Sequence, residues 1–272
     1  MTLRYFGYSD GRPVALQGED SAPAWLAARI EALHARIAAP RPPRHAEPER
    51  PPFPCHFAAI ARAKGALRYS YLRREELAHP DAFVDAVRAY LREPPSTRAL
   101  PALLVFVETP EEIVAPAQYE SAFWSLLQHL HDADTAPWPS ASPTDPEDPE
   151  WQLCFGGAPL FFVGKAPSYR LRESRWFDCL MVLVQTQATL DPVDGFTPEG
   201  ISIRERIRGA VVRYDGMALS PDLLDVGTPR YRDWRQYWLR DTNHEPSLPR
   251  CPLRLRTVRA PDAPSAEIND GA

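Results

Sequence analysis

The chain contains few of the residues that mark the commonest interaction surfaces. Of its 31 basic residues only Lys64 and Lys165 are lysines, and the formal net charge is -5, so no basic stripe favours nucleic acid. No window approaches the roughly 20 apolar residues that span a bilayer. The first residues lack the basic and apolar regions of a secretion signal. We therefore expect a cytoplasmic protein that binds neither nucleic acid nor membranes.

Paired cysteines and the common catalytic motifs are also missing. The four cysteines form no CxxC pair, so we expect reduced thiols and neither a structural zinc site nor a disulfide framework. The chain has no GxGxxG, GxxxxGK[ST], HExxH or GxSxG sequence, which removes the commonest phosphate-binding, zinc and serine-nucleophile signatures. With 31 prolines against 13 glycines, short elements and rigid loops are expected.

Apolar periodicity predicts both helices and strands. Helical spacing occurs in residues 22–38, 80–92, 119–132 and 201–214. Apolar runs at 100–108 and 177–185 are typical of buried strands, and 53–72 is helical or mixed. Because helices and strands do not alternate regularly, the pattern favours an α+β fold, a single domain with a mainly antiparallel central sheet flanked by helices.

The division of the chain follows its composition. Residues 1–50 are interpreted as an N-terminal helix and a proline-rich linker, and residues 51–258 as the main domain. Residues 259–272 are polar and are predicted to be a disordered tail.

One segment combines a hairpin with a cluster of arginines. Residues 151–163 alternate around a Gly-Gly pair and predict two strands joined by a tight turn. Arg170, Arg172 and Arg175 follow where the hairpin ends. A guanidinium suits carboxylates and phosphates, so an anionic ligand fits here. The alternative is that these are solvated surface arginines.

Two histidines lie two positions apart on the helix predicted at 119–132. They point to different faces, so they cannot both bind one metal. His131 shares a side with Trp124 and is the inward candidate, whereas His129 lies nearer the flank. An inward histidine among aromatic residues is either a core residue or an axial ligand of haem iron.

Cys55 lies between Pro54 and His56 where a helix is expected to begin. There the helix dipole could stabilise a thiolate. A thiolate ligand of haem iron is conceivable at this position, and the alternative is a buried structural thiol.

Several blocks together resemble the YqcI/YcgG family. They run in order from about residue 50 to 245, which covers most of the chain. The blocks are FPCHFA at 53–58, YESAFWSLLQHLHDADTAPWP at 119–139, WQLCFGGAPLFFVGKAPSYRLRESR at 151–175, IRERIRGAVVRYDG at 203–216 and WRQYWLRD at 234–241.

The resemblance implies a haem b enzyme that uses O2 or peroxide to hydroxylate a nitrogen of arginine or of a related guanidino or amino compound. It makes His131 the first candidate for the axial ligand and metal-binding residue, and Cys55 the second. His56 is a competing imidazole, since the family often has a less bulky residue after the FPC triplet. The haem pocket would also include Trp124, and its propionates or the substrate carboxylate would meet Arg170, Arg172 and Arg175.

The resemblance further implies a cationic small-molecule substrate and an external electron donor. Glu120, Asp132 and Asp134 beside the histidines are candidates to meet the substrate guanidinium, although each alone is typical of a solvated helix-end acid. A homodimer is a further partner to consider. Two alternatives stay open: a haem sensor or carrier without turnover, and a small-molecule binding domain without haem.

Overall fold

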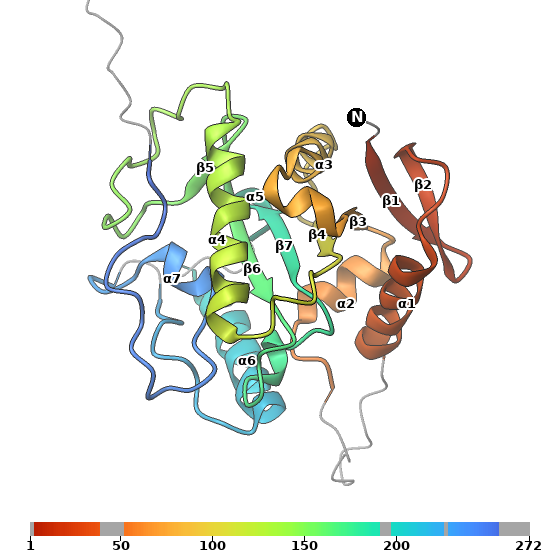
Figure 1. Cartoon of the computed structure of the whole chain (residues 1–272). Coiled ribbons are helices and arrows are strands. Elements are labelled where there is room, and N and C mark those ends of the chain that lie inside the picture. The colour runs from red at the N-terminus through yellow and green to blue at the C-terminus, as the bar shows by residue number, and fades with distance from the viewer. Residues whose placement is uncertain (1–2, 39–51, 191–196, 226–227, 256–272) are drawn as a thin grey trace, which may run out of the picture.

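Among the residues that the structure describes, seven strands form one mixed sheet at the centre of the fold (Figure 1). The computed structural model describes residues 3–38, 52–190, 197–225 and 228–255. The strand order is β2-β1-β3-β4-β7-β6-β5, in which β3 and β4 are parallel and the other neighbouring pairs are antiparallel. The strands are β1 (Arg4–Ser9), β2 (Arg12–Gly18), β3 (Leu67–Leu72), β4 (Ala102–Val107), β5 (Leu153–Phe155), β6 (Ala158–Lys165) and β7 (Met181–Thr186).

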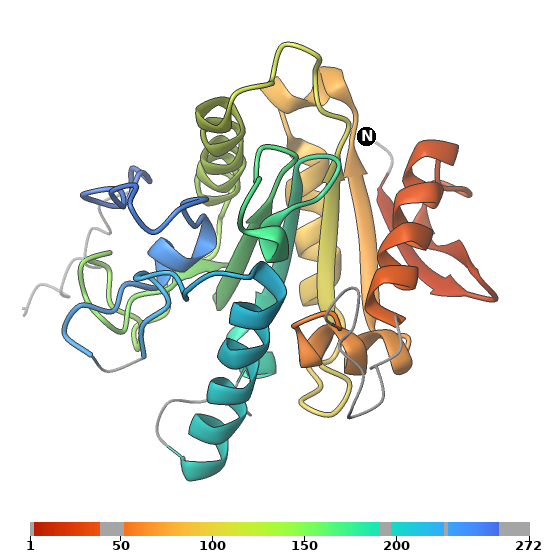
Figure 2. The same cartoon turned by 90° about the horizontal axis from the view of Figure 1, so that it is seen from below.

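Helices cover both faces of this sheet. Figure 2 shows α2 and α6 in front of the strands and α3 behind them. The helices are α1 (Ala24–Ala38), α2 (His56–Ala63), α3 (Asp81–Leu91), α4 (Pro116–Asp132), α5 (Gln187–Leu190), α6 (Pro198–Asp215) and α7 (Asp233–Tyr237), with short 3-10 turns η1 (Arg74–Ala78) and η2 (Glu173–Arg175). No helix in the described segments is long and apolar enough to cross a membrane.

The sheet face under α3 and α4 holds the larger core. Leu103 and Val105 of β4 point to this side because alternate strand residues face opposite ways. Val87 of α3 and Leu127 and Leu130 of α4 join them in one buried cluster. These helices therefore follow from the amphipathic spacing in the sequence.

The other sheet face is covered by α1, α2 and α6. Leu104 of β4 and Met181 of β7 point to this side, where they are buried with Leu26 and Ile30 of α1. α2 begins at His56, directly after the proline-led turn, and α6 begins at Pro198, where Thr197 Oγ1 accepts a hydrogen bond from Gly200 N at 3.1 Å. This face is less completely filled, and a cavity remains on it.

The predicted α+β fold with a mainly antiparallel sheet and flanking helices is confirmed. The helices predicted at 22–38, 80–92, 119–132 and 201–214 are present as α1, α3, α4 and α6, and the hairpin is β5–β6. The sequence interpretation missed β1 and β2, which extend the sheet from residues expected to hold a helix and a linker. Most of the predicted linker and all of the predicted tail lie outside the described residues.

Candidate active site

A cavity of about 370 Å³ lies between the second sheet face and helices α1, α2 and α6. Its walls are mostly apolar, because Phe161 and Val163 of β6 and Leu183 of β7 alternate toward this side. Ligand pockets of proteins are concave, mostly apolar spaces of roughly 300–1,000 Å³ with a few polar groups. By size and lining the cavity fits a small-molecule site, and its polar groups indicate the chemistry.

Cys55 lines this cavity at the first turn of α2. It is the N-cap residue, and its Sγ accepts a hydrogen bond from Ala58 N at 3.4 Å. Burial raises the pKa of the thiol, whereas the Ala58 N–H and the positive charge of Lys165 act in the opposite direction. Burial outweighs both effects, so the neutral thiol is the favoured form, and it is held next to helix N–H groups and a cation.

Lys165, the last residue of β6, brings an amine to the same cavity. Its Nζ donates to Ser174 O. Burial, with repulsion from Arg175 and Arg36, lowers the pKa of Lys165 to about 7. Sequence reasoning singles out this lysine only as one of two in the chain. The signal that could have placed it in the site is its position at the end of an apolar strand, where it points the same way as Phe161 and Val163.

Of the three predicted arginines, Arg175 lines the cavity. It is 8% exposed, and its guanidinium donates to Tyr237 O at 3.2 Å and to Gln236 O at 2.9 Å. Both acceptors are neutral carbonyls, and burial lowers the pKa of Arg175 to about 10. Arg175 therefore offers a buried positive charge for an anionic group.

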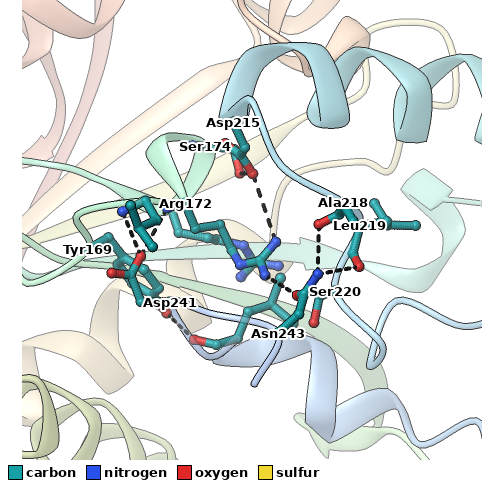
Figure 3. A network of polar contacts seen from close by, with 12 residues as sticks. Tyr169, Arg172, Ser174, Asp215, Ala218, Leu219, Ser220, Asp241 and Asn243 are labelled. Carbon is teal, nitrogen blue, oxygen red and sulfur yellow. Dashed lines mark hydrogen bonds and ion pairs between the residues drawn. The ribbon is translucent and has the colours of Figure 1, made fainter. Parts of the chain in front are cut away.

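Arg172 and Arg170 do not line the cavity. Figure 3 shows the Arg172 guanidinium among Asp215 and Asn243. Arg172 is 1% exposed and donates to Arg240 O at 2.8 Å and to Asn243 Oδ1 at 2.7 Å. Asp241 accepts from the backbone N–H groups of Arg170, Leu171 and Arg172 at 2.9–3.0 Å. Arg172 thus fastens the 240–243 segment to this loop, and the Arg170 side chain is exposed.

His131 is buried at 5% exposure, as predicted, but it lies on α4, at the other face of the sheet. Its ring is 6.4 Å from the ring of Trp138, in an edge-on arrangement. His129 is partly exposed and lies 2.8 Å from Asp81 Oδ1. Trp124 packs against the rings of Trp234 and Tyr237 in the same core. The structure therefore does not bring His131 and Trp124 together with Cys55 around the cavity.

The three predicted acids and His56 are also outside the cavity lining. Glu120 pairs with Arg240 at 2.5 Å, Asp132 accepts from Gln128 at 2.9 Å, and Asp134 accepts from Gly156 N at 2.9 Å. His56 is exposed on the outer side of α2. The assigned roles of these residues stay predictions, and the structure shows other partners for the acids.

The cavity has a carboxylate that the sequence analysis did not single out. Asp233, the first residue of α7, is 2% exposed and is the one acidic residue among the described lining residues. Its Oδ1 and Oδ2 accept hydrogen bonds from Tyr231 and Tyr237, both at 2.7 Å. Burial raises the pKa of Asp233 to about 6, against the opposite effect of the two tyrosines. The sequence feature that could have indicated Asp233 is its place at the start of an aromatic segment, residues 233–239, to which no role was assigned.

The described residues form an α+β fold with a mostly apolar cavity, whose lining includes a thiol, basic side chains and one carboxylate. Among the described residues, no group of three or more His, Cys, Asp and Glu side chains is placed to hold a metal ion. The chain belongs to the YqcI/YcgG family, whose model matches residues 46–254.

Curated relatives agree with this assignment. The chain is 34% identical to the uncharacterized protein YcgG of Bacillus subtilis (strain 168) over 154 residues, which are 56% of this chain and 60% of that protein. It is 33% identical to YqcI of the same organism, again over 60% of that protein. It is 31% identical over 214 residues, 76% of this chain and 79% of the relative, to DcsA of Streptomyces lavendulae, a proposed N(omega)-hydroxy-L-arginine synthase. No solved structure gives a significant match.

Proposed function

We propose that this protein is a haem-dependent N-oxygenase that hydroxylates a nitrogen of arginine or of a related guanidino or amino compound. Membership of the YqcI/YcgG family and the similarity to DcsA, described as a synthase of N(omega)-hydroxy-L-arginine, support the reaction type. O2 or peroxide would supply the oxygen atom, and an external donor would supply electrons. The observation that carries the proposal is the apolar cavity with Cys55 on its wall.

The donor set of the cavity fits a haem group. Cysteine thiolate is one of the protein ligands of haem iron, and Cys55 is the cavity residue of this type. Phe161 and Leu183 give apolar walls of the kind that a macrocycle contacts. Arg175 and Arg208 provide guanidinium groups, which pair with carboxylates such as haem propionates. Because His131 does not line this cavity, the proposal takes Cys55 as the iron ligand.

When bound, the haem supplies the redox chemistry that activates oxygen. The chain's own residues bind, orient and control protons. Cys55 is fixed at the start of α2 by the Ala58 N–H, so its sulfur has a defined position on the wall. Arg175 holds a positive charge on the wall of the same cavity, where it donates to two backbone carbonyls. The amine of Lys165, with its pKa near 7, can hold or release a proton within the cavity at neutral pH.

The proposal is tested by product analysis with haem-loaded protein. Wild-type protein, supplied with a chemical reductant and O2 or with peroxide, is expected to convert arginine or a related guanidino compound to a product with one added oxygen atom, measured by mass spectrometry. Cys55→Ser should lose most of this activity and most of its haem absorbance, because the hydroxyl is a poor ligand for haem iron. Cys251→Ser is the matched control, since Cys251 does not line the cavity.

Three outcomes would each contradict a part of the proposal. If wild-type protein takes up no haem, haem is excluded as the cofactor. If Cys55→Ser protein keeps the wild-type haem content and activity, Cys55 is excluded as the iron ligand. Haem-loaded protein that oxidises none of the guanidino or amino compounds offered would instead favour a haem sensor or carrier.

A further inference from the structure

Charge is distributed unevenly around the cavity. Lys165, Arg175, Arg204 and Arg208 place basic groups on its wall, and Asp233 is the one acid among the described lining residues. Arg204 and Arg208 lie 3.4 Å and 2.7 Å from Asp225 Oδ1, so an acid outside the lining partly balances them. A cation that enters this cavity is therefore repelled by these basic groups and attracted at Asp233.

The carboxylate of Asp233 keeps acceptor capacity for such a cation. A carboxylate has about four lone-pair positions on its two oxygens. The two tyrosine hydroxyls use one position on each oxygen, at 2.7 Å, and both are neutral groups. One position on each oxygen remains, which matches the two parallel N–H donors of a guanidinium. Because one hydroxyl binds each oxygen, the two hydroxyls also restrict the orientation of the carboxylate.

We infer that Asp233 is the carboxylate that receives the guanidinium of the substrate, and that Tyr231 and Tyr237 position it. This inference deepens the proposed function and rests on it for the identity of the substrate class. In this role, the Asp233 side chain alone makes the protein prefer a positively charged guanidino compound over a neutral compound of the same shape. It places the substrate's cationic end beside α7 (Asp233–Tyr237), which overlaps the family-like block at 234–241.

A purely structural role for Asp233 makes a different prediction. In that reading the acid ties Tyr231 to Tyr237, and an asparagine can preserve these contacts because its amide both donates and accepts. Asp233→Asn would then leave ligand preference unchanged. In the inferred role the same substitution removes the charge that selects a guanidinium, while the shape of the cavity is retained.

The test is binding calorimetry on wild-type, Asp233→Asn and Asp222→Asn proteins, with haem content recorded for each. Asp222 is the matched control, a buried aspartate outside the cavity lining that accepts from Ser247 Oγ at 2.6 Å. The probes are L-arginine, agmatine, which lacks the carboxylate, and L-citrulline, whose neutral urea has nearly the shape of a guanidinium.

Wild-type protein is expected to bind arginine at least about tenfold more tightly than citrulline. Asp233→Asn should weaken arginine and agmatine by about 30-fold and leave citrulline nearly unchanged, because one charge-assisted pair is lost. Asp222→Asn should match the wild type. Should Asp233→Asn fold poorly, the double variant Tyr231→Phe with Asp233→Ser removes the acid and one of its hydroxyl partners together, and it should show the same loss of preference.

The inference is overturned if Asp233→Asn keeps the wild-type affinity for arginine or the wild-type preference over citrulline. It is also overturned if haem-loaded wild-type protein binds neither arginine nor agmatine. Failure of the proposed function is seen separately, as absence of haem in the wild type. Guanidinium binding that depends on Asp233 in a protein without haem would sustain this inference and remove the oxygenase proposal.

Discussion

Arg172 and Arg175 are three positions apart, yet their surroundings differ. The guanidinium of Arg172 is enclosed by the 240–243 segment, and that of Arg175 lies on the cavity wall. Their sequence context predicts guanidinium groups near a strand end; both residues follow β6 in the chain, but only Arg175 of the two lines the cavity. It could not separate the two roles, because the partners that decide them are 62 and 71 residues away in the chain.

The same limit applies to the titratable groups of the cavity. Cys55 was a candidate from its place at a helix start, and the structure puts it on the cavity wall. Lys165 and Asp233 were not candidates, since a lone lysine at a strand end and a lone acid before a tryptophan occur widely on protein surfaces. What distinguishes them is burial, which tertiary packing determines.

Asp233 should make the stability of the protein depend on pH. Its pKa is about 6 in the folded protein against an ordinary value of 3.8, so the folded state binds the proton more tightly. This contribution to stability is fully present below the unfolded value and is lost as the pH rises through the folded value. Between pH 4 and pH 7 the unfolding free energy of the wild type should fall by about 2 kcal/mol relative to Asp233→Asn.

Urea unfolding of both haem-free proteins across this range measures that difference. Parallel pH curves for the two proteins would show that burial does not shift the pKa of Asp233.

At the scale of elements, the strongly patterned segments were predictable and the N-terminal hairpin was missed. α1, α3 and α4 have clear apolar stripes because each buries one face against the sheet. β2 is mostly exposed, so its sequence has little apolar signal. The signal that could have found the hairpin is the Asp10-Gly11 pair, whose φ angles of 51° and 77° suit a tight two-residue turn.

β6 connects the cavity to the opposite core. Val163 and Lys165 face the cavity, whereas Gly164 faces α4 and the segment after α7. A Cβ on Gly164 would lie 2.4 Å from Trp238 Cε3 and 3.0 Å from Phe123 Cδ2. Because glycine has no side chain, the strand backbone can pack directly against these rings. This packing sets the position of Val163 and Lys165 on the cavity wall.

Gly164→Ala is accordingly expected to lower the unfolding free energy by about 1–3 kcal/mol, because the methyl group forces the rings apart. Gly209→Ala in α6 is the control, since its nearest neighbour is the flexible end of Arg213 at 3.4 Å. The control should be neutral or raise stability by up to about 1 kcal/mol, through better helix propensity. Denaturant titration compares the two, and equal stability of Gly164→Ala and wild type would contradict this packing.

At the scale of the whole molecule, residues before the family match complete both the sheet and the cavity. The family model begins at residue 46, whereas β1, β2 and α1 precede it. β1 pairs with β3, and Leu33 and Ile37 of α1 line the cavity. The N-terminal elements are thus part of the structure that forms the site, which a resemblance limited to the later blocks could not indicate.

Phe6→Ala tests how much the packing of β1, β2 and α1 contributes to the unfolding free energy of the whole domain. Phe6 is 0% exposed and is buried with Tyr69 and Phe106. Removal of the Phe6 ring should lower the unfolding free energy by about 3–5 kcal/mol, and the protein should still unfold in a single transition. Leu16→Ala, at a residue that is 47% exposed, should change it by less than about 0.5 kcal/mol. Thermal unfolding of Phe6→Ala that matched the wild type would show that the N-terminal elements contribute little to the folded state.

We propose that haem binds in the cavity between α2 and α6 through Cys55. This ligation is tested most directly by the absorption spectrum of haem-loaded protein, reduced and exposed to carbon monoxide, in the wild type, Cys55→Ser and His131→Ala. If Cys55 is the ligand, we expect the red-shifted band of thiolate ligation in the wild type and in His131→Ala, and its loss in Cys55→Ser. An imidazole-type band in the wild type that disappears in His131→Ala would contradict ligation by Cys55 and move the haem site to the α4 side of the sheet.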